Sequence, residues 1–160
     1  MLNRCRLYYE LLVVHSFVRW LVLLSLLTVI ARAVIGLRSA KAFTATDRAL
    51  LNTTFVVFLT QASLGIWLYF ISPLVEYFML NFSTAVHQRE PRFFGMEHIT
   101  MMVFATLLVV VGFVRVRRMK TDCAKFKCAL RWFGVAFAVV LISIPWGFAP
   151  LVFRPLFRFN

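Results

Sequence analysis

Four long apolar stretches dominate the 160-residue chain and constrain its fold more than any other feature. They cover residues 11–35, 49–71, 94–114 and 130–148. A membrane-crossing helix needs about 20 mainly apolar residues, so each stretch is long enough to cross a bilayer. We therefore expect one all-α domain over residues 1–160, an integral membrane four-helix bundle that runs up-down-up-down.

The overall composition supports the same class of protein. Hydrophobic residues make up 62% of the chain and charged residues only 15%, whereas soluble domains average about 45–50% and about 25%. A domain of this size still exposes roughly a third of the surface of its unfolded chain, so it cannot hide this much apolar surface in one core. A soluble globular enzyme and a disordered chain are both excluded, and the lipid bilayer is the first expected partner.

The basic residues predict the orientation of the bundle. The two connections after the first and third stretches, with their edges, carry eleven of them: Arg32, Arg38, Lys41, Arg48, Arg115, Arg117, Arg118, Lys120, Lys125, Lys127 and Arg131. The opposite side carries six: Arg4, Arg6, Arg89, Arg92, Arg154 and Arg158. Because basic loops stay cytoplasmic, the bias predicts a multi-pass protein of a bacterial inner membrane with both termini periplasmic. The sequence contains no nucleic-acid-reading motif, and we expect no nucleic-acid partner.

The three cysteines carry little information. Cys5, Cys123 and Cys128 are too few and too scattered for a disulfide framework. Cys123 and Cys128 are expected in a basic loop between the third and fourth spans. Free thiols facing a reducing cytosol are the better interpretation than a zinc site, because neither a histidine nor a third cysteine stands near that pair.

Ionisable residues inside the spans are the main functional signal, because charge is costly in a bilayer. The first span contains His15 and Arg19, and the third contains Glu97 and His98. Gln61 is the most polar side chain of the second span. The fourth span has no charge after its first residues.

The two histidines are expected at one depth. Each lies about four residues into its span, and these two spans run in the same direction, so both side chains fall about 6 Å below the periplasmic end. The first and third spans are also diagonal partners in a bundle whose sequence neighbours are neighbours in space. Two imidazoles facing each other in this way can hold a six-coordinate haem iron, so we predict His15 and His98 as its axial ligands.

Nearby residues complete the predicted cofactor site. Arg19 lies one turn from His15 and can pair with Glu97 or with a haem propionate. Gly65 would let a flat ring approach the second span, although glycine also serves helix packing. Trp146 fits cofactor contact and an ordinary interfacial aromatic belt equally well.

Three alternatives remain open. The polar residues can form a structural network without a cofactor, fixing helix register in a haem-free accessory subunit of a larger membrane complex. His15, His98 and Glu97 can bind a transition metal. Arg19, Glu97 and His98 can line a site for a quinone or another small molecule.

Four short motifs in order resemble one known family. They are HSFVRWL at 15–21, YFISP at 69–73, EH at 97–98 and IPW at 144–146. Together they resemble the small four-helix "cytochrome b" membrane proteins of Bacteroidetes over nearly the whole chain. The sequence departs from that pattern at Phe17, where the family has a small residue, and at Gly147, where it has a second proline. The resemblance implies a b-type haem and electron transfer.

The expected function is therefore that of a haem b-binding membrane cytochrome making one-electron transfers near the periplasmic face. Its partner would be a quinone, a periplasmic electron carrier or a larger respiratory complex. One haem cannot carry electrons across the full membrane, so a relay or subunit is favoured over a complete enzyme. No phosphate-binding loop, paired carboxylates or HExxH motif indicates hydrolytic or phosphoryl-transfer chemistry.

Overall fold

The computed structural model describes residues 2–146, and over this range the chain is helical without strands. Four helices are long and apolar enough to cross a membrane. They are α1 (Leu2–Arg38), α2 (Ala45–Ile71), α6 (His98–Arg118) and α7 (Asp122–Ser143). The prediction of an all-α bundle with four helices long and apolar enough to cross a membrane is confirmed.

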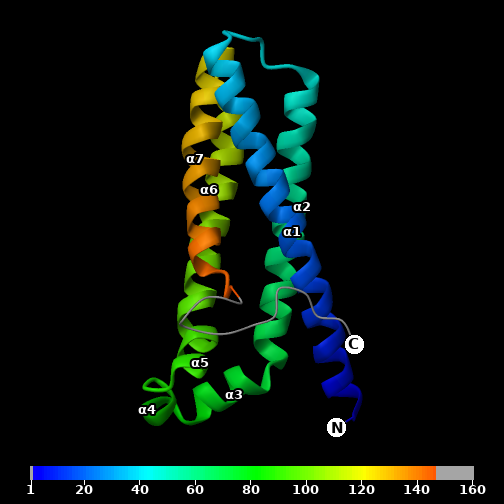
Figure 1. Cartoon of the computed structure of the whole chain (residues 1–160), viewed down its shortest axis with the longest axis vertical. Coiled ribbons are helices and arrows are strands. Elements are labelled where there is room, and N and C mark those ends of the chain that lie inside the picture. Colours follow the sequence, from blue (N-terminus) through cyan, green and yellow to red (C-terminus); the bar gives the residue numbers. More distant parts are fainter. Residues whose placement is uncertain (1, 147–160) are drawn as a thin grey trace.

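Shorter helices connect α2 to α6. They are α3 (Pro73–Leu80), α4 (Phe82–Ala85), α5 (Arg89–Arg92) and the π-helix η1 (Phe93–Glu97). Figure 1 shows α3 lying across one end of the bundle, called the α3 end below. The connections 39–44 and 119–121 lie together at the opposite end, called the loop end.

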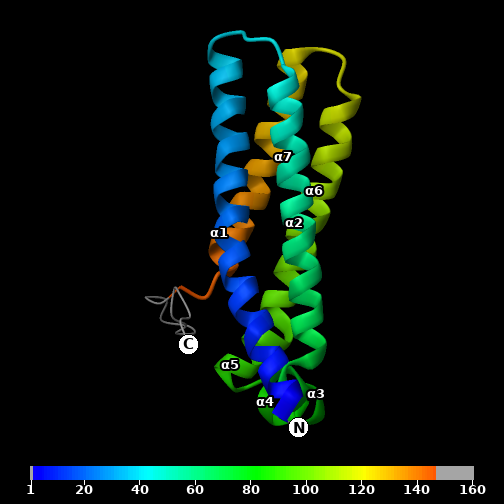
Figure 2. The ribbon, with the colours of Figure 1, turned by 90° about the vertical axis from the view of Figure 1, so that its right-hand side faces the viewer.

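Successive long helices run antiparallel, as expected (Figures 1 and 2). Helix α1 packs against α2 and α7, while α6 packs against α2 and α7. Helices α1 and α6, which carry the two span histidines, are therefore diagonal partners. This is the arrangement that the sequence predicted from sequence neighbours being neighbours in space.

The helices begin and end at other residues than the predicted spans. The length of an apolar stretch indicates the part of a helix that can cross a membrane and not the limits of the whole helix. Helix α1 begins at Leu2 instead of near residue 11, since no helix-breaking residue separates the two positions. Helix α7 ends at Ser143 instead of residue 148, because Pro145 has no N–H and disfavours helix in the residue before it. Regular α-helix in the third span begins at His98, after η1.

The predicted loop around the cysteine pair is wrong. Thr121 caps α7, its hydroxyl oxygen accepting from the Ala124 N–H at 3.2 Å, so Cys123 and Cys128 lie on the first turns of this helix. Both are free thiols, one exposed and the other half-buried. The side chain of Cys5 lies outside the described part of the structure.

The bundle packs densely toward the loop end. The largest fully buried side chains all lie in this half or at its border: Leu26, Thr54, Val109, Val116, Phe126 and Phe133. Small residues permit the close approach, since a Cβ added at Gly112 would lie 2.6 Å from Trp132 Cβ. The opposite half, toward the α3 end, is less filled and contains the candidate site.

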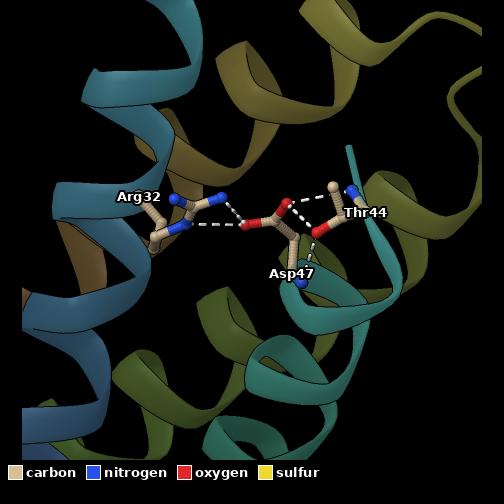
Figure 3. Close-up of polar contacts among 3 residues, drawn as sticks. All are labelled: Arg32, Thr44 and Asp47. Atoms are coloured by element: carbon tan, nitrogen blue, oxygen red, sulfur yellow. Dashed lines mark hydrogen bonds and ion pairs between the residues drawn. The ribbon is translucent and has the colours of Figure 1, made fainter. Parts of the chain in front are cut away.

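An ion pair between the half-buried Arg32 and the buried Asp47 ties α1 to the start of α2 at the loop end (Figure 3). Arg32 Nε and Nη2 each lie 2.9 Å from Asp47 Oδ1. Asp47 Oδ2 accepts from the Thr44 backbone N–H at 2.9 Å, and the Thr44 hydroxyl oxygen accepts from the Asp47 N–H at 3.4 Å. Thr44 and Asp47 thus form a reciprocal N-terminal cap, while only 4% of Asp47 is exposed.

We predict that Asp47→Ala lowers the free energy of unfolding by about 2 kcal/mol, because it removes the carboxylate that accepts from the Thr44 N–H and leaves Arg32 without its ion-pair partner. Thermal unfolding in detergent micelles measures the change. Glu10→Ala is the matched control, because the Arg6–Glu10 pair is exposed and its loss should have no measurable effect. Equal stability of the two variants would contradict the prediction.

Candidate functional site

A cavity of about 370 Å³ occupies the half of the bundle toward the α3 end. All four long helices contribute to its wall, together with α3 and η1. Most of the wall is apolar. Its larger polar side chains are Tyr8, His15, Arg19, Gln61, Tyr69 and His98. The cavity therefore collects both span histidines and the span arginine, which the sequence predicted to lie together.

His15 lies on the cavity face of α1, one turn before Arg19. The Gln61 amide nitrogen on α2 lies 3.0 Å from the His15 backbone carbonyl and 3.2 Å from His15 Nε2. A carbonyl only accepts, so this amide atom is the nitrogen, and Nε2 accepts its second N–H. The proton of the neutral imidazole is then on Nδ1.

Two buried polar atoms in this cluster are not satisfied within the described structure. His15 Nδ1 and the Gln61 side-chain oxygen each lack a hydrogen-bond partner there. Buried polar groups are normally hydrogen-bonded, and exceptions concentrate where a ligand, an ion or water completes the site. The cluster of His15 and Gln61 is therefore a candidate binding feature.

The sequence predicted that a flat cofactor ring approaches α2 at Gly65. In the structure, the imidazole ring of His15 approaches there instead. A Cβ added at Gly65 would lie 3.2 Å from His15 Cε1. The missing side chain on α2 thus makes room for the imidazole itself. Gly65 also lines the cavity.

His98 is held in one orientation by the end of α7. Its Nδ1 lies 3.0 Å from the carbonyl oxygen of Ser143, the last residue of that helix. The final carbonyls of a helix have no partner within it, so the imidazole Nδ1–H satisfies one of them. Nε2 then carries the lone pair, and the ring lines the cavity. Such a backbone bond to the other ring nitrogen is typical of metal-ligating histidines.

The π-helix η1 directly precedes His98. The Tyr69 hydroxyl on α2 donates to the Gly95 carbonyl at 2.9 Å, and Gly95 contacts the Phe78 ring of α3 so closely that no Cβ would fit. These contacts connect the start of α6 to α2 and α3. Single-turn π-helices are frequent at functional sites.

Two predicted site residues lie elsewhere. Glu97 forms an ion pair with Arg92 at 2.7 Å, its side chain is 43% exposed, and it is not part of the cavity wall. Trp146 also lies outside the wall: its indole N–H donates to the Leu141 carbonyl at 2.9 Å, and its ring packs edge-on against Trp20. Arg19 does line the cavity, with its guanidinium carbon 5.4 Å from the Trp20 ring centroid.

The described residues were compared with the ligand sets that metal ions need. Between residues 2 and 146, no three or more His, Cys, Asp and Glu side chains come together in a way that could hold one. The alternative that His15, His98 and Glu97 bind a transition metal is therefore not supported.

Sequence reasoning did not assign Gln61, Tyr69 or Ser143 to the site. Two signals were available: Gln61 is the most polar side chain of its span, and Tyr69 opens the YFISP motif. Ser143 contributes a backbone carbonyl, which no side-chain pattern can reveal.

Compared with known proteins, the chain matches no family model, no curated protein and no solved structure.

We predict that His98→Phe destabilises the protein by about 1–2 kcal/mol, because it leaves the buried Ser143 carbonyl unsatisfied. His98→Asn should retain most of the stability, since its side-chain N–H is reached through the same number of atoms as the Nδ1–H of histidine. Thermal unfolding in micelles, with amide hydrogen exchange at residues 140–146, measures both effects. Equal behaviour of the two variants would argue that the bond to Ser143 contributes nothing.

Proposed function

We propose that this chain is a multi-pass protein of a bacterial inner membrane that binds haem b in the cavity and makes one-electron transfers. The observation that carries the proposal is that His15 and His98, on diagonal helices, line one cavity. The size of the cavity, about 370 Å³, is within the range of about 300–1,000 Å³ typical of small-molecule and cofactor sites. The resemblance to the four-helix "cytochrome b" family points to the same group.

The residues present fit haem in different degrees. His98 fits directly, because its bond to Ser143 leaves Nε2 as a ligand atom facing the cavity. His15 fits once Gln61 releases it, since Nε2 now accepts from the amide. The pairing of His15 with Gln61 leaves two polar atoms without hydrogen bonds to the described residues, namely the Gln61 side-chain oxygen and His15 Nδ1.

Each residue would then have a defined task. When bound, haem supplies the Fe(II)/Fe(III) couple. His15 and His98 would bind the iron. Ser143 keeps the His98 ring turned, and Arg19 offers a guanidinium to a propionate. The apolar wall excludes water from the group.

The orientation and partner follow from charge. The loop end carries the eleven basic residues of the predicted cytoplasmic side, so the cavity and both termini belong to the periplasmic side. The electron partner is then a quinone, a periplasmic carrier or a larger respiratory complex. A single haem near one face serves as a relay or subunit and not as a complete enzyme.

A specific observation also favours a second function. The side chains of His15 and His98 both bond to neighbouring helices, to Gln61 on α2 and to the carbonyl of Ser143 on α7. Such interhelical bonds fix register in membrane bundles. The chain would then be a haem-free accessory subunit, and its exposed apolar side chains would contact lipid and neighbouring subunits.

The optical spectrum of protein purified from haem-replete cells separates the two functions. We expect a Soret band and sharp α and β bands on reduction for the haem protein, and a colourless sample for the haem-free subunit. His98→Asn keeps the bond to Ser143 but removes the ligand, so it should fold and lose the low-spin bands. His15→Gln should do the same.

His87→Ala is the control, because His87 is exposed between α4 and α5 and should leave the spectrum unchanged. A red wild type whose low-spin bands survive in both ligand variants would show that other residues bind the iron.

A further inference from the structure

The exposed part of the cavity wall lies on two neighbouring helices, α2 and α6. Of its wall residues, Ile66 on α2 and Val103 and Leu107 on α6 are 49%, 49% and 57% exposed. All three are aliphatic. The opening therefore has an apolar rim, while His15, Arg19 and Gln61 lie in the wall contributed by α1 and α2.

The same cavity is covered toward the α3 end. Leu74 and Val75 of α3 and Phe94 of η1 form that part of the wall, and Val75 is only 6% exposed. The bond from Tyr69 to the Gly95 carbonyl ties η1 to α2 beneath the cavity. Figure 1 shows α3 crossing this end of the bundle, where water would otherwise approach.

The position of the rim makes it face lipid. Leu107 lies nine residues after His98, about 14 Å farther along α6 toward the middle of the span. Ile66 lies five residues before the end of α2. An apolar opening at this depth faces the hydrocarbon of the bilayer, where aliphatic side chains are well solvated. Entry of a charged ligand from water at this depth would be unfavourable.

We propose that the cavity takes its ligand sideways from the bilayer through the slot between α2 and α6, and not from the aqueous phase across the α3 end. The slot is defined by Ile66, Val103 and Leu107. The identity of the ligand, haem with its planar apolar ring, rests on the proposed function. The route itself rests on the exposed rim and the covered end.

Thiol labelling in liposomes tests the route without haem. Ala62→Cys places a thiol in the cavity wall, in a chain whose Cys5, Cys123 and Cys128 are replaced by serine. A membrane-dissolved pyrene maleimide should label it several-fold faster than a sulfonated, membrane-impermeant maleimide. Leu107→Trp, which narrows the slot, should slow the pyrene reagent several-fold. Leu27→Trp, at an exposed α1 position that does not line the cavity, is the matched control.

Thr106→Cys on α6 is a second wall position if Ala62→Cys does not fold, and Ile66→Trp is a second way to narrow the slot. Faster labelling by the sulfonated reagent, or labelling by pyrene maleimide that neither tryptophan slows, would overturn the proposal.

Loading of haem from donor liposomes gives an independent readout. Leu107→Trp should slow the appearance of the Soret band several-fold but reach the wild-type spectrum, while Leu27→Trp loads at the wild-type rate. Equal loading rates of all three proteins would overturn the route. If the wild type never acquires a spectrum, the proposed function fails, and the thiol labelling still decides the route.

Discussion

The fold depends on one constraint: inside a bilayer, each backbone N–H and C=O must find its partner within the protein. Long helices satisfy the constraint over most of the chain, and the difficult places are their ends. At the loop end, Thr44 and Asp47 cap α2. At the end of α7, which stops before Pro145, the Ser143 carbonyl accepts from His98. His98, which the sequence predicts as a haem ligand, therefore caps the end of α7.

The same constraint explains why the two halves of the bundle differ. Toward the loop end, glycine positions such as Gly36 and Gly112 let aromatic rings pack directly against neighbouring helices. Toward the α3 end, polar side chains occupy the inner faces of α1, α2 and α6, and each needs a partner. They meet around a cavity instead of closing it, and two polar atoms of the His15–Gln61 pair remain unsatisfied by the described protein.

Structural and functional explanations of these residues are connected. The bond from His98 to Ser143 stabilises the end of α7 and, by fixing the proton on Nδ1, leaves the lone pair on Nε2 of a ring that lines the cavity. Gln61 orders the His15 ring but occupies the nitrogen that would bind iron. The two histidines therefore differ, because Nε2 has no partner among the described residues in His98 but accepts from Gln61 in His15. The sequence alone gives no reason to distinguish them. In the proposed function, Gln61 is the group that must move, and the proposed slot between α2 and α6 gives the ligand its route.

Sequence alone determined the membrane class, the number of long helices and the diagonal placement of His15 and His98, because apolar length and connection order are local properties of the chain. It also identified Arg19 and Gly65 as neighbours of the site. It misplaced Glu97, which pairs with Arg92 five residues before it, and Trp146, which packs on Trp20, because side-chain direction depends on helix rotation. Tertiary structure alone decided three features: the capping of the Ser143 carbonyl by His98, the pairing of His15 with Gln61, and the exposure of the cavity wall on α2 and α6. Each of them arises where separate helices meet, and the distance between two helices is not encoded in either segment alone.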